Sequence, residues 1–366
     1  MPTRADTSAS PAPAHPDARP IVDQIIAQAA SRRASDVHVE PMADRYEVRL
    51  RIDGLLETVA AHDSTVGRAI VARLMVLAHL LTYRLDVPQE GRLSVNIHSP
   101  PLQLDLRLAV MPTTHGLRAA VRMPAELLQP TTLEALDLPT HVTDGLKRFA
   151  NSDSGMLLFT GPAGSGKTTS IYALLQHITA TFPGLSIVSL EDPVERDLPG
   201  VTQIEVSPFG QLTYARALRS ILRQDPQVLM LGEIRDAETA TLALQAALSG
   251  HRLISTFHAS SAAGAVARLI EMGAAPYQIT SALCGVVSQR LLRRRTPTGY
   301  SGRVPVAEFV QLDEASRTAI LRRDDAQTLG SLLHRQKDFV SLRQSARHLV
   351  ESGVTDAGEL ARVLGE

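Results

Sequence analysis

Two parts of the chain carry different patterns of hydrophobic and polar positions. In the first part, apolar residues either recur at spacings of three and four or alternate strictly with polar residues, which predicts helices and half-buried strands respectively. The predicted elements are a helix over 21–33, a strand over 46–52 with a turn at Asp53 and Gly54, a helix over 68–81, and strands over 91–97 and 102–110. This mixture indicates a small α+β domain over residues 21–130.

In the second part, short continuous apolar runs alternate with longer amphipathic segments. The runs predict strands over 156–160, 185–190, 201–206, 228–231 and 253–256, and the amphipathic segments predict helices over 169–178, 214–223, 237–248 and 262–271. This alternation is typical of an α/β fold with a mostly parallel sheet, which we place at 155–290 after a linker over 131–154. Beyond Ser281 the pattern is mainly helical apart from one strand at 304–310, so a helical C-terminal region is expected over 291–366.

Composition changes this picture little. Hydrophobic residues make up 44% of the chain and charged residues 20%, as in ordinary globular proteins, and the net charge of −1 gives no reason to expect a nucleic-acid partner. The first 20 residues are rich in proline, alanine and serine and are expected to form a disordered leader. The apolar run at 74–83 falls short of the roughly 20 residues needed to cross a bilayer. A single cysteine, Cys284, excludes a disulfide framework and a cysteine-based zinc site.

The stretch from Gly161 to Thr168 fits the phosphate-binding pattern G-x-x-x-x-G-K-[ST] between a predicted strand and a predicted helix. Glycines let the backbone N–H groups and the positive end of the helix approach phosphate oxygens. Lys167 would reach the β- and γ-phosphates, and the Thr168 hydroxyl would hold Mg²⁺. We therefore predict that a nucleoside triphosphate is bound by Gly161, Pro162, Ala163, Gly164, Ser165, Gly166, Lys167, Thr168 and Thr169.

Acidic residues follow two of the predicted strands, where a parallel sheet places its ligands. Glu191 opens the acidic segment 191–195, and Glu233 follows the strand 228–231, although Gly232 stands where many such sites carry aspartate. His258 follows the strand 253–256, and the residues alone leave open whether it is structural or senses the γ-phosphate. The basic run 290–295 is predicted to be a solvated helix end, and Cys284 a small buried residue on an apolar helix.

Taken together, these motifs resemble those of the ATPases of type II secretion and type IV pilus assembly. The first domain contributes ASDVHVEP, VRLRIDG, GRLSVNI and DLRLAVMPTTHG. The second contributes, in the order of that family, GPAGSGKTT, SLEDPVE, LRSILRQDPQVLMLGEIRDAETA, LQAALSGH and STFHAS.

The resemblance implies a RecA-like ATPase domain preceded by a PAS-like domain, arranged as a homohexameric ring in which ATP binds between the two domains. It implies that Thr168, Glu191 and Glu233 hold Mg²⁺ and that His258 lines the γ-phosphate site. Arginines of the first domain would stabilise charge within or between subunits, and the candidates are Arg92, Arg107 and Arg122. The implied partner is an inner-membrane platform protein, which would keep a cytoplasmic motor at the membrane periphery.

Three features depart from the pattern of that family. No cysteines follow the segment 288–294, so we expect no zinc; Ala259 and Ser260 follow His258; and no large extra N-terminal domain precedes the first motif. The predicted function is a hexameric motor for pseudopilus or pilus assembly. A pilus retraction ATPase and a non-hydrolysing nucleotide-binding regulator are the alternatives, and the direction of the motor is left open.

Overall fold

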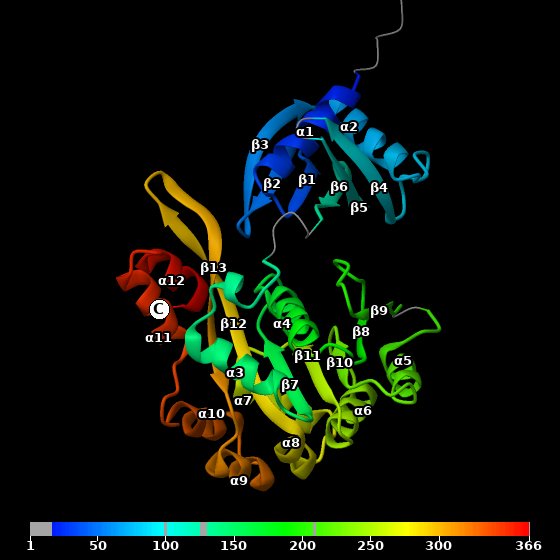
Figure 1. Cartoon of the computed structure of the whole chain (residues 1–366). Coiled ribbons are helices and arrows are strands. Elements are labelled where there is room, and N and C mark those ends of the chain that lie inside the picture. The colour runs from blue at the N-terminus through cyan, green and yellow to red at the C-terminus, as the bar shows by residue number, and fades with distance from the viewer. Residues whose placement is uncertain (1–16, 99–100, 125–129, 208–209, 366) are drawn as a thin grey trace, which may run out of the picture. The chain divides into compact units, whose positions relative to one another are not determined.

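The computed structural model describes residues 17–98, 101–124, 130–207 and 210–365 (Figure 1). The chain divides into two compact units, Met1–Leu128 and Gln129–Glu366. Residues 1–16 of the expected leader lie outside the described residues. Its last two residues do not belong to a leader, because the first helix, α1, spans Arg19–Ser31.

The first unit contains a six-stranded sheet in the order β3-β2-β1-β6-β5-β4, whose neighbouring strands are all antiparallel. The strands are β1 (Asp36–Pro41), β2 (Arg45–Ile52), β3 (Leu55–Asp63), β4 (Gln89–His98), β5 (Pro101–Thr113) and β6 (Gly116–Arg122). Buried alternate residues of the strands form one hydrophobic core with α1 and with α2 (Ser64–Leu77). The α+β prediction for this part is therefore confirmed.

Besides β1 and β6, which were not predicted as strands, two elements of the first unit differ from the prediction. The helix expected over 68–81 begins earlier, because the Asp63 carboxylate caps it by accepting hydrogen bonds from the backbone N–H groups of Thr65 (2.8 Å) and Val66 (3.1 Å). The strand β3 was not predicted. It lies at the edge of the sheet, and its residues are mostly half-buried or exposed without strict alternation, so its sequence lacks the period of two.

The second unit contains a seven-stranded sheet in the order β13-β12-β7-β11-β10-β8-β9, which is parallel except for β13. The strands β7 (Gly155–Thr160), β8 (Ile187–Glu191), β9 (Thr202–Glu205), β10 (Val228–Leu231) and β11 (Arg252–Phe257) confirm the five predicted strands. The predicted helices correspond to α4 (Lys167–Thr181), α5 (Tyr214–Ile221), α6 (Ala237–Leu248) and α7 (Ala262–Glu271). The unit has an α/β fold with a mixed sheet.

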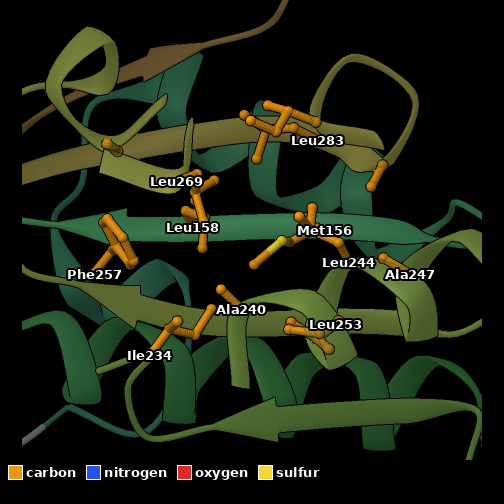
Figure 2. Close-up of a cluster of buried hydrophobic side chains, with 14 of the residues drawn as sticks. Met156, Leu158, Ile234, Ala240, Leu244, Ala247, Leu253, Phe257, Leu269 and Leu283 are labelled. Carbon is orange, nitrogen blue, oxygen red and sulfur yellow. The ribbon is translucent and has the colours of Figure 1, made fainter. Parts of the chain in front are cut away.

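Each face of this sheet has its own hydrophobic core. Met156 and Leu158 of β7 belong to the core formed with α5 to α10, whereas Leu157 and Phe159 belong to the core formed with α3 and α4. Figure 2 shows the first core, where β7 and β11 contribute Met156, Leu158, Leu253 and Phe257 and α6 contributes Ala240, Leu244 and Ala247. Burial on both faces explains why the strands read as continuous apolar runs.

The stretch 131–154 is not a linker. It contains a short 3-10 helix, η2 (Glu134–Leu136), and the helix α3 (Thr140–Ala150). Val142, Leu146 and Phe149 of α3 are buried in the core of the second unit. The boundary between the two units therefore lies before these elements, at Leu128 and Gln129.

The prediction of helical structure after Ser281 is wrong for about the first twenty residues, 283–303, whereas the strand predicted over 304–310 is confirmed. A short helix, α8 (Pro276–Ala282), leads into β12 (Leu283–Thr296), which forms a long antiparallel hairpin with β13 (Gly299–Val310), shown in yellow and orange in Figure 1. Both faces of β12 are buried at its start, because Val286 packs in the core on one face of the sheet and Val287 in the core on the other, and such a run cannot be told from a helix by its period. Cys284 and the basic run 290–295 consequently lie on a strand.

Helices form the rest of the second unit. They are α9 (Glu314–Arg322), α10 (Ala326–His334), α11 (Leu342–Glu351) and α12 (Ala357–Leu364). The last two pack on the hairpin, where Ala346 of α11 joins a small core with Leu292, Val304 and Val306. Glu359 of α12 is buried there and binds the Arg293 side chain at 2.8 Å and the Arg362 side chain at 2.6 Å.

Candidate nucleotide-binding site

The predicted phosphate loop connects the end of β7 to the start of α4. Gly166 precedes the helix with a φ of 86°, and Gly161 has a φ of 143°, values that L side chains rarely adopt. A Cβ atom at Gly161 would lie 2.5 Å from the Gln289 carbonyl oxygen, and one at Gly166 would lie 2.8 Å from the Gln289 amide nitrogen. Glycine is therefore required at both positions by the backbone and by the neighbouring strand β12.

Lys167 lies at the start of α4 and is 8% exposed. Its Nζ donates hydrogen bonds to the carbonyl oxygens of Gly161 (2.8 Å) and Pro162 (2.9 Å). Burial and the nearby charge of Arg290 lower the pKa of Lys167. The Ser165 hydroxyl is buried and has no hydrogen-bond partner among the described residues. A buried cation and an unpartnered hydroxyl in one loop fit a bound anion, and the half-buried Thr168 and Thr169 follow directly on the helix.

Glu233 follows β10, and the structure brings it together with His258, which follows the neighbouring strand β11. Nε2 of His258 lies 3.2 Å from Oε2 of Glu233, while the other carboxylate oxygen forms an ion pair with Arg235. The hydrogen bond that Arg235 donates to the Glu233 carboxylate raises the pKa of Arg235. The carboxylate is thus fixed from two sides at the carboxyl edge of the sheet, where parallel sheets bind ligands.

The position of Tyr214 explains why glycine precedes Glu233, where many such sites carry aspartate. A Cβ atom at Gly232 would lie 2.6 Å from the Tyr214 hydroxyl oxygen and 3.3 Å from the Leu190 carbonyl oxygen. Tyr214 is 9% exposed, and burial together with the charge of Glu233 raises the pKa of its hydroxyl. The space that a side chain at position 232 would need is therefore filled by a neutral phenol.

Glu191 ends β8 and is 2% exposed. Its Oε2 accepts a hydrogen bond from the Tyr172 hydroxyl, and its Oε1 accepts hydrogen bonds from Ser189 Oγ (2.5 Å) and Gln203 Nε2 (3.0 Å). Burial and the bond to Glu191 raise the pKa of Tyr172, so the phenol stays a donor. Both oxygens of Glu191 are thus occupied within the protein interior, whereas both partners of Glu233, Arg235 and His258, are about half exposed.

Two residues of β12 belong to this site although the sequence did not predict them. The Gln289 amide donates to the Ser165 carbonyl oxygen (2.9 Å) and accepts a hydrogen bond from Ser170 Oγ (2.9 Å). The guanidinium of Arg290 contacts the carbonyl oxygens of Gln289 and Ser260. Arg290 is therefore not part of a solvated helix end. A strand assignment for 283–296 would have revealed both residues, because its parallel pairing with β7 ends at Ser288 and Thr160, beside the loop.

The three candidate arginines of the first unit lie in one row across its sheet. Arg92 of β4 pairs with Arg107 of β5, and Arg107 pairs with Arg122 of β6. Arg122 in turn pairs with Asp36 of β1. Directly opposed residues share a face of the sheet, and all three arginines are exposed. Opposed like charges repel one another, so this row is a favourable place for an anionic ligand.

The sequence matches one protein family over nearly its full length. Residues 14–362 match the family described as type II/IV secretion system protein. The chain belongs to this family. A member from Pseudomonas aeruginosa, type II secretion system protein HxcR, is 36% identical over 94% of this chain and 76% of its own length. Type II secretion system ATPase E of Vibrio cholerae is 34% identical over 94% of this chain and 75% of its own.

A solved structure supports the same assignment. The pilus retraction motor PilT with bound ADP superposes with a TM-score of 0.65 at 26% identity, covering 93% of this secretion-family chain and 96% of PilT. Within the described ranges, no helix has both the length and the apolar character needed to span a membrane.

Proposed function

We propose that this secretion-family protein is a Mg²⁺-dependent ATPase that powers assembly of a pseudopilus or pilus in a type II secretion or type IV pilus-like system. The observation that carries the proposal is the phosphate loop, in which Lys167 is buried beside the unpartnered Ser165 hydroxyl. The Glu233 and His258 pair adds the acidic group that hydrolysis requires. The names of the relatives, a secretion ATPase and a pilus retraction motor, support this class of reaction.

The residues present fit the proposed ligand. Lys167 and the backbone N–H groups of the loop would hold the phosphates, and the Thr168 hydroxyl and Glu233 would hold Mg²⁺, which when bound neutralises phosphate charge. Glu233 would also orient the attacking water, with His258 fixing its carboxylate. That Glu191 shares the metal stays a prediction; its occupied oxygens favour a positioning role.

The exposed arginine row of the first unit supports a role in charge stabilisation. We propose that Arg107 and Arg122, with Arg92 beside them, meet the phosphates of ATP in the same or a neighbouring subunit. An arginine that stabilises transition-state charge is worth about 10³ to 10⁵ in rate, so Arg107→Gln or Arg122→Gln should nearly abolish turnover if that residue plays this part.

The proposed assembly is a homohexamer, which a heterologous interface closes into a ring so that each neighbour completes a site. In this proposal the first unit is PAS-like, the second is RecA-like, and the ring acts on an inner-membrane platform protein from the cytoplasm. We propose no nucleic-acid partner. The absence of a zinc site also stays a prediction, supported by the single cysteine of the sequence.

The test compares ATP hydrolysis by the wild type, the Glu233→Gln variant and a control variant, Glu271→Gln, at the exposed end of α7. We expect Glu233→Gln to lower the rate by at least about a hundredfold and the control to retain it. Light scattering with Mg-ATP should give the mass of six subunits.

The two alternative functions, a non-hydrolysing regulator and a retraction ATPase, predict different experimental results. A wild type that binds ATP but hydrolyses it no faster than Glu233→Gln, even when assembled, would identify a non-hydrolysing regulator. A retraction ATPase would hydrolyse ATP in the same way, but its deletion would leave cells with excess pili instead of none.

A further inference from the structure

The middle of β12, just beyond its pairing with β7, carries an arginine that joins two segments of the phosphate site. Nη1 of Arg290 donates a hydrogen bond to the Gln289 carbonyl oxygen at 2.9 Å, and Nη2 donates one to the Ser260 carbonyl oxygen at 3.2 Å. Ser260 lies just beyond His258 in the same connection between β11 and α7. A single guanidinium thus bridges the strand beside the phosphate loop and the segment that carries His258.

Arg290 also lies next to the loop itself. A Cβ atom at Gly161 would be 3.0 Å from Nη1 of Arg290. Nζ of Lys167 donates to the Gly161 carbonyl oxygen at 2.8 Å, so both cations lie at Gly161, and the charge of Arg290 lowers the pKa of Lys167. Burial lowers the pKa of Arg290 as well. Two partly desolvated cations therefore share one small region around Gly161.

Neutral groups satisfy both cations. In the hydrogen bonds of the described residues, Lys167 donates to the carbonyl oxygens of Gly161 and Pro162, and Arg290 to those of Gln289 and Ser260. A phosphate oxygen carries negative charge, so it accepts a stronger hydrogen bond from a cation than a neutral carbonyl oxygen does, and the planar guanidinium matches phosphate geometry. A triphosphate at this loop would offer both cations better acceptors and would remove their repulsion.

We propose that Arg290 is a phosphate-binding residue whose guanidinium exchanges the Ser260 carbonyl for a phosphate oxygen when ATP binds, and so releases the His258 segment. The inference rests on the proposed binding of ATP at the loop. It assigns Arg290 both to nucleotide affinity and to the coupling between the phosphate loop and the Glu233–His258 pair.

The hydrogen bonds that hold the His258 segment explain why its release from Arg290 would matter. Arg268 of α7 holds the His258 carbonyl oxygen at 3.2 Å, and Arg290 holds the Ser260 carbonyl oxygen, so two arginines restrain the segment. When the hydrogen bond from Arg290 to Ser260 is lost, the His258 segment is held mainly by Arg268 of α7. His258 can then adjust its position relative to Glu233, which it contacts at 3.2 Å.

The first measurement is the affinity for a non-hydrolysable ATP analogue with Mg²⁺, by calorimetry. Loss of a charged hydrogen bond should make binding to Arg290→Gln about tenfold to a hundredfold weaker, whereas Arg290→Lys, which keeps the charge, should lose less. The matched control is Arg294→Gln in the same basic run, because Arg294 pairs with Asp137 away from the loop. We expect its affinity to stay within about twofold of the wild type. Thermal unfolding confirms that each variant is folded.

The second measurement is hydrogen exchange of the peptide 257–264. In the wild type, the ATP analogue should accelerate exchange in this peptide, and in Arg290→Gln exchange should be fast with or without the analogue. Equal affinity of wild type and Arg290→Gln would overturn the binding role, and exchange unaffected by the analogue would overturn the release. If the wild type itself bound no ATP, the proposed function would fail first. If Lys167→Ala abolished binding while Arg290→Gln bound the analogue as tightly as the wild type, only the present inference would fail.

Discussion

The hydroxyl of Tyr172 donates a hydrogen bond to Oε2 of Glu191, so the helix that begins with Lys167 holds the acid at the end of β8. The same hydroxyl oxygen lies 3.3 Å from the backbone N–H of Glu195, from which it accepts a hydrogen bond. One phenol therefore fixes both ends of the acidic segment 191–195 relative to the phosphate loop.

Replacing Tyr172 by phenylalanine should separate the acidic segment from nucleotide binding. The change leaves a buried oxygen of Glu191 without one donor, which costs about 1 to 3 kcal/mol of stability. We expect kcat to fall while the affinity for ATP changes little, because the loop and Lys167 are untouched. Calorimetry and steady-state kinetics would check this, with Tyr277→Phe at an exposed position as the control. A loss of affinity at unchanged kcat would contradict the assignment.

A second prediction concerns the contact between Gly232 and Tyr214. An added methyl group at position 232 would collide with the Tyr214 hydroxyl at 2.6 Å, so Gly232→Ala should destabilise the protein by about 1 to 3 kcal/mol and displace Glu233. In a Tyr214→Phe background the cost should be smaller, with a residual part from the Leu190 carbonyl oxygen. Urea unfolding of the four proteins of this cycle measures the coupling. Strictly additive effects would show that the two residues do not meet.

The Gln289 side chain should be needed to hold the phosphate loop. Gln289→Glu keeps the shape and the acceptor for Ser170, but it loses the donor to the Ser165 carbonyl oxygen and places a negative charge beside the phosphates. We expect ATP to bind at least about tenfold more weakly. The control is Gln176→Glu on α4, the helix that carries Ser170, where the amide donates to the exposed Pro199 carbonyl oxygen. Equal losses in the two variants would point to a general effect of charge.

A fourth prediction concerns pH and the C-terminal helices. Burial raises the pKa of Glu359, but hydrogen bonds from Arg362 and Arg293 outweigh burial and lower it from 4.5 to about 2. Because the folded pKa is the lower one, the carboxylate stabilises the fold above pH 4.5, and this contribution disappears as the pH falls from 4.5 to about 2.

Glu359→Gln should therefore cost about 3 kcal/mol at pH 7, since the half-buried Arg293 and the exposed Arg362 lose the buried anion that they share. The difference from the wild type should shrink below pH 4.5. Hydrogen exchange of α12 at several pH values reports this locally, and Glu351→Gln at the exposed end of α11 is the control. A difference that stayed constant down to pH 3 would exclude an ionised Glu359 as the cause.

The sequence predicts the parts of the fold that depend on local pattern. The five strands from β7 to β11 read as apolar runs bounded by turns, and the phosphate loop has a fixed spacing between a strand and a helix. The meeting of Glu233 and His258 also follows, because both residues leave the same edge of neighbouring parallel strands.

What the sequence does not predict depends on contacts between distant segments. The start of β12 is buried on both faces of the sheet, with Val286 in one core and Val287 in the other, so its residues carry no alternation that would distinguish strand from helix. Arg290 begins the basic run 290–295, and Gln289 directly precedes it. This run resembles a solvated surface until the pairing of β12 with β7 is known. The burial of Glu191 likewise depends on Gln203 and Tyr172, which come from two other elements.

The hydrogen bond that Gln289 donates to the Ser165 carbonyl oxygen also determines when the site is completed during synthesis of the protein. The two residues are 124 positions apart, so the phosphate loop leaves the ribosome long before the strand that completes it. Until β12 emerges and pairs with β7, Ser170 and the Ser165 carbonyl lack their partner. A nascent chain that ends before β12 would carry the whole phosphate-binding motif and still lack a finished site, so nucleotide binding is tied to near-completion of the chain.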